Sequence, residues 1–282
     1  SLNNHDNYDV FIFVCYLYYT TYFGLPKVAD KAIFIPTAHE EAPIHLKIFE
    51  NMFKLPAAFY YNTVEELELT HKLFPGTEKK PDNYGKGGVG VEVPANVDPE
   101  GFKAKFGLDD NFILYVGRID ENKCCPELFK YFAEYKKRHA DSDLKLVLMG
   151  KEMIEVPKRD DIISLGFVSE EDKFSGIKAS KFFILPSKYE SLSIVVLESM
   201  AMNKPVLVSA DCPVLQGHCK RSNAGLYYHG YFEFEGCVDY LLTHEDIVQG
   251  MGENGKKYVD SDYSWEELVR GYENLIGRVL EG

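Results

Sequence analysis

The sequence predicts an α/β protein built on parallel, doubly wound sheets. Short apolar runs recur along the chain, and most are followed by a segment whose apolar residues have helical spacing. Crossovers between parallel strands are right-handed, so this alternation places helices on both faces of a sheet. The 282 residues are 45% hydrophobic and 27% charged, which is ordinary for a globular protein and allows one large domain or two smaller ones.

The first part of the chain contains three apolar runs. The earliest, residues 9–18, is continuous and therefore predicts a strand that is buried on both faces. Thr63-Val-Glu-Glu66 has the form of a capping box, which predicts the start of a helix. The elements expected here are strands at 9–18, 31–36 and 57–61, and helices at 41–53 and 63–74.

A segment rich in proline, glycine and lysine follows at residues 75–90 and is typical of a loop or linker. Residues 89–94 predict a short strand, and we place the domain boundary beside it. The expected domains are residues 3–92, an amino-terminal domain, and residues 93–280, a carboxyl-terminal domain.

The alternation of strand and helix is clearer in the second domain. Residues 181–209 read as a strand, a loop, a buried helix and another strand. The other elements expected are strands at 112–116, 144–149, 162–166 and 224–228, and helices at 125–139, 169–179, 232–242 and 265–280.

In a parallel sheet the loops after the strands all open onto one edge. The loops at 117–123, 150–151, 166–168 and 189–193 are therefore expected to converge, and they carry Arg118, Lys123, Lys151 and Glu190. Fixed cations beside a helix amino terminus suit a diphosphate, because free amides and the helix dipole stabilise anionic oxygens. Glu198 is surrounded by apolar residues, where a carboxylate is costly to bury alone, and it suits a ribose diol.

Charge and cysteine content narrow the classes of partner. The net charge of −13 opposes attraction to phosphate backbones, so nucleic acid is not expected as a partner. The six cysteines have no zinc-type spacing and predict free thiols in a reducing cytosol. The apolar run at 10–19 is too short to span a membrane, and acidic residues precede it where a signal peptide would be basic. We therefore expect a cytoplasmic protein.

Several motifs occur in a specific order: Tyr115-Val-Gly-Arg118 with Lys123, Leu165-Gly-Phe-Val168, and Glu190-x7-Glu198 continuing to Leu207. In this order and spacing, they resemble the donor-binding domain of GT-B glycosyltransferases of family 4, the retaining group 1 enzymes. The resemblance extends from about Val93 to Leu280. The segments Pro36–Glu41 and Phe59–Glu66 resemble the second half of that family's acceptor domain. The resemblance implies two Rossmann-like domains, the amino-terminal one incomplete.

The resemblance also implies catalytic roles. Arg118 and Lys123 would bind the donor diphosphate and stabilise charge on the leaving nucleotide. Glu190 would lie at the donor sugar and phosphate in a binding and electrostatic role. His39 matches a histidine that reaches the donor from the opposite domain.

The remaining roles concern donor binding. Glu198 would hold the ribose hydroxyls, the amides of residues 192–194 would cradle phosphate, and the backbone of residues 166–168 would contact the base. The expected donor-binding residues are Gly117, Gly166, Phe167, Val168, Ser191, Leu192, Ser193, Ile194 and Glu198.

The resemblance implies no cofactor and no metal, with a nucleoside-diphosphate sugar as donor and a glycan or other hydroxyl compound as acceptor. A membrane surface and a separate amino-terminal half remain open as further partners. The chain also departs from the family: Cys124, Ser191, Ser193 and Asn203 stand where it often has glycine.

Two alternatives compete with a transferase. The chain could be a noncatalytic nucleotide-sugar-binding module that lacks a competent acceptor side. A dinucleotide-dependent oxidoreductase is disfavoured, because no G-x-G-x-x-G motif follows a predicted strand.

Overall fold

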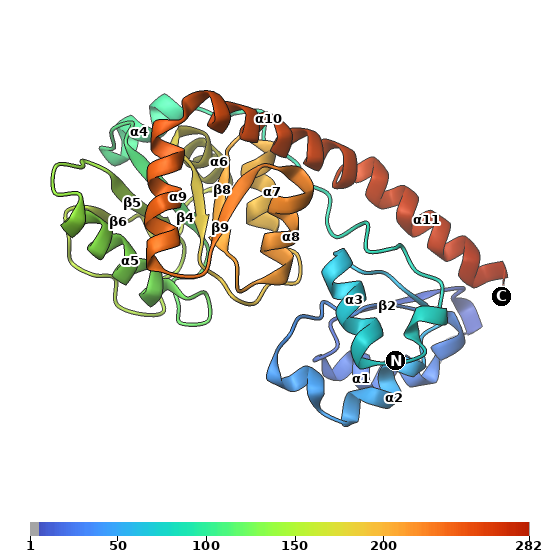
Figure 1. Ribbon diagram of the computed structural model, residues 1–282. Coiled ribbons are helices and arrows are strands. Elements are labelled where there is room, and N and C mark those ends of the chain that lie inside the picture. Colours follow the sequence, from blue (N-terminus) through green and yellow to red (C-terminus); the bar gives the residue numbers. More distant parts are fainter. Residues whose placement is uncertain (1–5, 282) are drawn as a thin grey trace. The chain divides into compact units, whose positions relative to one another are not determined.

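The structure is a computed structural model that describes residues 6–281, and its chain forms two compact units (Figure 1). The amino-terminal unit comprises residues up to Gly90 together with those from Asp262 onward, and the carboxyl-terminal unit comprises Val91–Ser261. The division falls two residues before the predicted one. Residues 265–280 were expected in the carboxyl-terminal domain, but the structure assigns them to the amino-terminal unit.

The amino-terminal unit contains a parallel three-stranded sheet in the order β1-β2-β3. Its strands are β1 (Phe11–Val14), β2 (Ala32–Ile35) and β3 (Ala58–Phe59). Its helices are α1 (Tyr19–Gly24), α2 (Ile48–Lys54), α3 (Val64–Leu73) and α11 (Trp265–Glu281), with short 3₁₀ turns at Leu25–Lys27, Ala29–Lys31, Ala42–His45 and Thr77–Lys79. Thr63 caps α3 as predicted, because its side chain accepts a hydrogen bond from the Glu66 amide.

Three expectations for this unit are wrong. The predicted strand at 9–18 is only four residues long, and Ile12 and Val14 are 48% and 47% exposed, so it is not buried on both faces. The helix expected at 41–53 is divided into a 3₁₀ turn and α2, and residues 89–94 form no strand. Residues 75–90 form a loop as expected, apart from the 3₁₀ turn at Thr77–Lys79, and the Asn83 side chain fixes this loop because it accepts from the Tyr61 amide and donates to the Tyr61 carbonyl.

Helix α11 completes the core of the amino-terminal unit. Leu268 and Leu275 are buried against a cluster from β2 and β3 that includes Ile33 and Ala58. The rings of Tyr60 and Tyr272 stack with centroids 4.1 Å apart. A sequence pattern shows that α11 is amphipathic but not which sheet its apolar face covers, and this explains the error in its assignment.

The carboxyl-terminal unit is a parallel six-stranded sheet in the order β6-β5-β4-β7-β8-β9. Its strands are β4 (Phe112–Val116), β5 (Lys145–Met149), β6 (Ile162–Ser164), β7 (Phe183–Leu185), β8 (Val206–Ser209) and β9 (Gly225–Tyr228). Each strand falls within a segment that the sequence predicts as a strand. The order reverses between β4 and β7, which is the switch point at which doubly wound sheets bind ligands.

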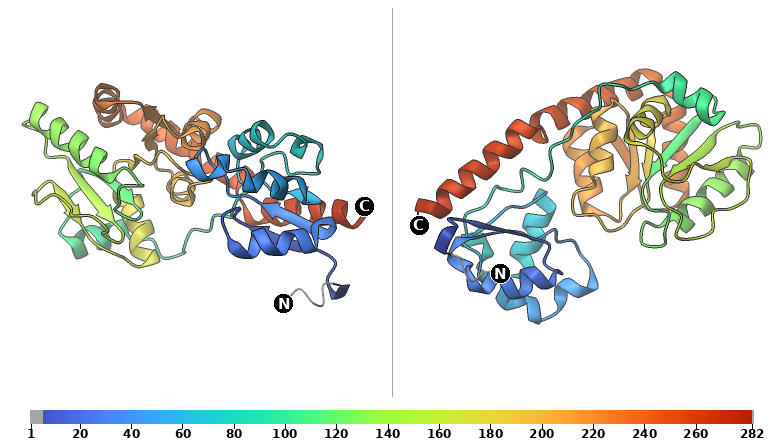
Figure 2. Two further views of the ribbon diagram at one scale, coloured as in Figure 1. Left: turned by 90° about the horizontal axis from the view of Figure 1, so that it is seen from below. Right: turned by 180° about the vertical axis from the view of Figure 1, so that it is seen from behind.

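Helices cover both faces of this sheet (Figures 1 and 2). They are α4 (Pro99–Phe106), α5 (Cys125–Arg138), α6 (Glu170–Ala179), α7 (Ile194–Ala201), α8 (Pro213–Ser222), α9 (Tyr231–Thr243) and α10 (Glu245–Asp262). α6 contacts α4 and α7, whereas α5 contacts α9. The fold class, α/β with parallel doubly wound sheets, is confirmed.

Two further findings bear on the environment of the chain. All six cysteines are free thiols. Among residues 6–281, no helix has the length and apolar character needed to cross a membrane.

Candidate functional site

The loops after β4, β5 and β6 are bonded to one another at the carboxyl edge of the sheet. The Gly117 amide donates to the Met149 carbonyl (2.9 Å), and the Gly150 amide donates to the Gly166 carbonyl (2.7 Å). A Cβ atom on Gly150 would lie 1.9 Å from the Gly117 carbonyl oxygen, so the backbones can approach this closely only because residue 150 is glycine. The loops therefore converge as predicted.

Lys123 and Glu190 meet across the switch point. Lys123 follows β4 and Glu190 follows β7, and the Lys123 Nζ atom donates to Glu190 Oε1 at 2.6 Å. The side chains are 24% and 11% exposed, so the pair is partly sheltered from water. The sequence predicted that these two residues lie in converging loops, and the structure brings their charged atoms together.

Arg118 lies in the same loop as Lys123 but is more open to solvent. Its Nε atom is 3.5 Å from Asp120 Oδ2, and its side chain is 63% exposed. Asp120 is buried and also accepts a hydrogen bond from the Lys123 amide (2.8 Å). Asp120 therefore shapes the loop and holds Arg118 near it, a role that the sequence reading missed.

The start of α7 lies directly after Glu190. Ser193 is the residue before the helix and has a left-handed backbone with φ of 64°. The first amides of a helix have no partner within the helix, so those near Ile194 are available to an anion. The Ser193 Oγ atom is buried and makes no hydrogen bond within the described part of the chain.

His218 supports this loop from α8. Its Nε2 atom donates to the Leu192 carbonyl (2.8 Å), because a carbonyl oxygen can only accept. Its Nδ1 atom lies 3.0 Å from the Tyr258 hydroxyl. His218 is fully buried, so it holds the backbone of residues 190–193 from the interior of the unit, through the Leu192 carbonyl. The sequence carries no local signal for this contact, because residues 192 and 218 are 26 positions apart.

Glu198 is half-buried on α7 and pairs with Lys173 of α6. The Lys173 Nζ atom donates to Glu198 Oε1 at 2.7 Å. Burial raises the pKa of Glu198, and the ammonium group of Lys173 opposes that shift. Glu198 therefore has the partner that its apolar surroundings require, and sequence reasoning did not identify Lys173.

The other predicted donor-binding residues lie in the same two regions. Phe167 is 91% exposed after β6, beside the half-buried Val168 and Gly166, so an aromatic face is available there. Ser191 is half-buried between Glu190 and the buried Leu192. Their places at the carboxyl edge follow from the sheet topology.

His39 belongs to the amino-terminal unit, in the loop after β2. Its Nε2 atom is 3.5 Å from Glu41 Oε1, which also accepts a hydrogen bond from the Tyr16 hydroxyl (2.6 Å). The neighbouring Ala38 amide donates to Glu66 (2.6 Å), whose pKa is raised to about 8 by burial. These contacts, all within the amino-terminal unit, hold the loop that carries His39.

Three of the four residues that stand where the family often has glycine have a backbone suited to glycine, and Ser191 is the exception. The φ angles of Cys124, Ser193 and Asn203 are 56°, 64° and 59°, all in the left-handed region. Cys124 lies immediately before α5, and burial raises the pKa of its thiol. A left-handed backbone is less favourable for these three side chains than for glycine.

The sequence also contains two short patterns, Asp-x-Asp and G-x-G-x-x-G, and both lie outside the loops of this site. Asp141-Ser142-Asp143 precedes β5 at its amino end, and Asp260-Ser261-Asp262 ends α10, so neither Asp-x-Asp tripeptide is in a carboxyl-edge loop. Residues 85–90 have G-x-G-x-x-G spacing but open no helix. Neither motif contributes to this site.

Comparison with known proteins gives the family. The model of the family "Glycosyl transferases group 1" matches residues 97–258, more than half of the chain. α-D-Kanosaminyltransferase of Streptomyces kanamyceticus is 30% identical over 57% of this chain and 44% of its own length. An uncharacterised glycosyltransferase of Methanocaldococcus jannaschii is 27% identical over 64% of this chain and 48% of its own. The chain thus spans about half the length of these curated relatives.

Solved structures share the fold. Sucrose-phosphate synthase of Thermosynechococcus elongatus aligns with a TM-score of 0.77 at 16% identity, covering 98% of this chain and 74% of that one. The Anabaena protein HepE in complex with UDP aligns with a TM-score of 0.78 at 12% identity, covering 98% and 80%. At these identities the likeness concerns the fold, which is the GT-B arrangement of Rossmann-like domains. The chain belongs to the group 1 glycosyl transferases, because the model of that family matches more than half of it, and the shared fold agrees with this.

Proposed function

We propose that the chain binds a nucleoside-diphosphate sugar at the switch point of its larger sheet and transfers the sugar to a hydroxyl acceptor. The observation that carries this proposal is the Lys123–Glu190 pair, which joins the loops after β4 and β7 beside the start of α7. A cation, a carboxylate and free helix amides at one point suit a diphosphate attached to a neutral sugar.

The diphosphate would replace Glu190 as the partner of Lys123. An ammonium group 2.6 Å from a carboxylate oxygen is already aimed at an anion, and Arg118 is exposed enough to turn toward the same ligand. Both cations would stabilise the negative charge that grows on the leaving diphosphate as the glycosidic bond breaks. These two side-chain cations would supply positive charge at the diphosphate without a metal ion.

The nucleoside would extend toward α6 and α7. Glu198, held by Lys173, offers carboxylate oxygens to the ribose hydroxyls, and the exposed Phe167 ring with the backbone of residues 166–168 would contact the base. Glu190, once released from Lys123, would face the donor sugar. Retention of the anomeric configuration and attack on the face that the diphosphate leaves follow from the family and are part of the proposal. His39 would reach the donor from the other domain.

A thermal-shift panel tests donor binding directly. UDP, GDP, ADP and UDP-glucose are added separately, and we expect at least one to raise the melting temperature, by an amount that grows with the logarithm of the ratio of its concentration to its dissociation constant. Lys123→Ala should abolish the rise, because it removes the cation that faces the diphosphate. Lys130→Ala is the matched control. Lys130 is an exposed lysine in α5, the helix that follows the Lys123 loop, and its loss should leave the rise in melting temperature unchanged. No shift with any nucleotide would refute the proposal.

The small amino-terminal sheet favours one alternative, a donor-binding module without a competent acceptor side. That sheet has three strands in the described residues, whereas the carboxyl-terminal sheet has six. The two functions differ in turnover. Hydrolysis of UDP-glucose, or transfer to a mixed glycan pool, followed by release of UDP indicates the transferase, whereas binding without release indicates the module.

A further inference from the structure

A second pocket lies at the amino edge of the six-stranded sheet, the edge opposite the nucleotide loops. Its volume is about 220 Å³, below the roughly 300–1,000 Å³ of pockets for drug-sized ligands, so it suits a small ligand. Lys181 precedes β7 and Lys204 precedes β8, and α9 and α10 supply the other wall. None of these residues takes part in the proposed transfer.

Two lysines, Lys181 and Lys204, line this pocket, and the charge of a third, Lys178, acts on Lys204. Lys204 donates from Nζ to the Ser180 carbonyl (2.6 Å), and Lys178 donates from Nζ to the Met202 carbonyl (3.3 Å). The pKa of Lys204 is lowered to about 8 by burial and by the positive charges of Lys178 and Lys181. An ammonium group has three donors, so the carbonyl bond leaves Lys204 able to bind a ligand.

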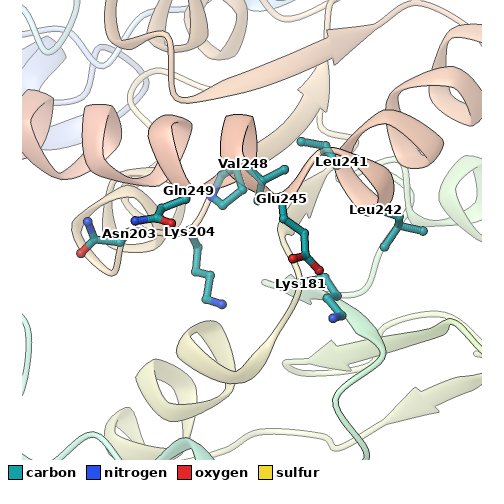
Figure 3. Close-up of a pocket in the computed structure, with 9 residues that line it drawn as sticks. Lys181, Asn203, Lys204, Leu241, Leu242, Glu245, Val248 and Gln249 are labelled. Atoms are coloured by element: carbon teal, nitrogen blue, oxygen red, sulfur yellow. The ribbon is translucent and has the colours of Figure 1, made fainter.

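One carboxylate belongs to the pocket. Figure 3 shows Glu245 of α10 pointing toward Lys181, with Lys204 on its other side. The two lining ammonium groups and one carboxylate leave an excess of one positive charge, and Lys178 adds positive charge beside Lys204. This excess is unusual on a chain whose net charge is −13. The remaining wall is apolar and includes Pro205, Leu241 and Val248.

We propose that this pocket binds a small molecule that carries a phosphate monoester. A phosphate monoester has a charge of about −1.5 to −2 near neutral pH, and the positive charge of Lys181, Lys204 and the nearby Lys178 exceeds the negative charge of Glu245 and attracts it. Its oxygens accept hydrogen bonds from the ammonium groups of Lys181 and Lys204. The organic part of the ester packs on the apolar wall, in the way that small-ligand sites combine an apolar surface with a few polar groups.

The charged groups of the pocket make the affinity for a phosphate monoester depend on pH. Lys204 must be protonated to bind the anion, and its amine is largely protonated below pH 8 and increasingly neutral above it. Affinity should therefore be highest between about pH 6 and pH 8. It should fall above pH 8 as Lys204 loses its proton, and below about pH 6 as the phosphate takes up its second proton. The other charged groups that face Lys204 are Lys178 on α6, Lys181 before β7 and Glu245 on α10.

The proposal is tested by trace acetylation of lysines with acetic anhydride, mapped by peptide mass spectrometry. Inorganic phosphate and phenyl phosphate are the probes. At a concentration about ten times the dissociation constant, we expect the acetylation rates of Lys204 and Lys181 to fall about tenfold. Lys220, exposed on α8, is the internal control and should be unaffected. Protection should weaken above pH 8.

The labelling also separates this pocket from the nucleotide site. Protection of Lys204 should persist in Lys123→Ala, and Lys204→Met should abolish the protection of Lys181. Phenyl phosphate should protect at lower concentrations than inorganic phosphate, because its ring covers the apolar wall. Equal potency of the two probes would overturn the assignment to an ester, and protection of Lys123 alone, or of no lysine, would overturn the site.

Discussion

Glu190 and Lys123 neutralise each other in the structure, and this makes their separate roles measurable. If the donor diphosphate takes Lys123 from Glu190, the carboxylate competes with the ligand until it is displaced. Loss of Glu190 would therefore affect binding and transfer in opposite directions, which loss of a residue that only shapes the loop would not do.

We predict that Glu190→Gln raises the affinity for UDP and lowers the rate of sugar transfer. Losing a partly sheltered ion-pair partner worth about 1 kcal/mol frees Lys123 and should raise affinity roughly fivefold. Transfer should fall tenfold or more, on the order of a lost electrostatic contact at the reacting sugar. Isothermal titration calorimetry and a UDP-release assay give the two values, with Glu121→Gln as the exposed control in the same loop. A parallel fall in affinity and rate would contradict the competition.

The sequence predicted part of this site at the residue scale. Lys123 and Glu190 could be placed together because sheet topology alone brings the ends of β4 and β7 to one edge. Lys173 and His218 could not, since their partners Glu198 and Leu192 lie on other helices or loops, and no local spacing encodes such contacts. The roles of these side chains toward a donor remain predictions.

At the scale of elements, strands were predicted more completely than helices. The six strands of the carboxyl-terminal sheet are buried apolar runs that are visible in the sequence, whereas α4, α8 and α10 were not predicted. In α10 the reason is its glycines, which usually weaken a helix. Gly252 and Gly255 serve close packing: a Cβ atom on Gly252 would lie 2.2 Å from the Asn203 carbonyl oxygen.

This packing gives a prediction with an internal control. Gly252→Ala should destabilise the protein by about 1–3 kcal/mol, because the backbone of Asn203 must move away from the new methyl group. Gly250→Ala, two residues earlier in α10, should stabilise it by up to about 1 kcal/mol, because its Cβ meets nothing within 4 Å and alanine favours the helix. Urea denaturation measures both. Equal effects of the two substitutions would show that packing against Asn203 does not decide the sign.

At the scale of the whole molecule, the chain leaves the amino-terminal unit at Gly90 and returns to it at Asp262. The sequence predicted two domains but treated each as continuous. Nothing in the amphipathic pattern of α11 distinguishes one sheet from the other, so the return could not be predicted. The exposure of Ile12 and Val14 in β1 could not be predicted for a similar reason, since both lie on one face of the strand and its covering depends on tertiary packing and not on composition.

We predict that Leu275→Ala destabilises the amino-terminal unit by about 2–4 kcal/mol, because Leu275 is 2% exposed in the core between α11 and the sheet. Hydrogen exchange should accelerate at the amides of β2, which lies 240 residues earlier in the chain. Leu280→Ala is the control, because Leu280 is 57% exposed on the same helix. Faster hydrogen exchange at the amides of β4 and β5, and not at those of β2, would show that α11 packs on the carboxyl-terminal unit.

The return of α11 also fixes an order of events during synthesis. The carboxyl-terminal unit is a single stretch, Val91–Ser261, so all of its residues are available as soon as Ser261 has been made. The amino-terminal sheet is translated before that stretch but lacks the helix that covers Ile33 and Tyr60 until α11 has been made after it. At ordinary rates of translation that delay is on the order of ten seconds or more. The amino-terminal unit can therefore complete its core only after the whole carboxyl-terminal unit has been synthesised.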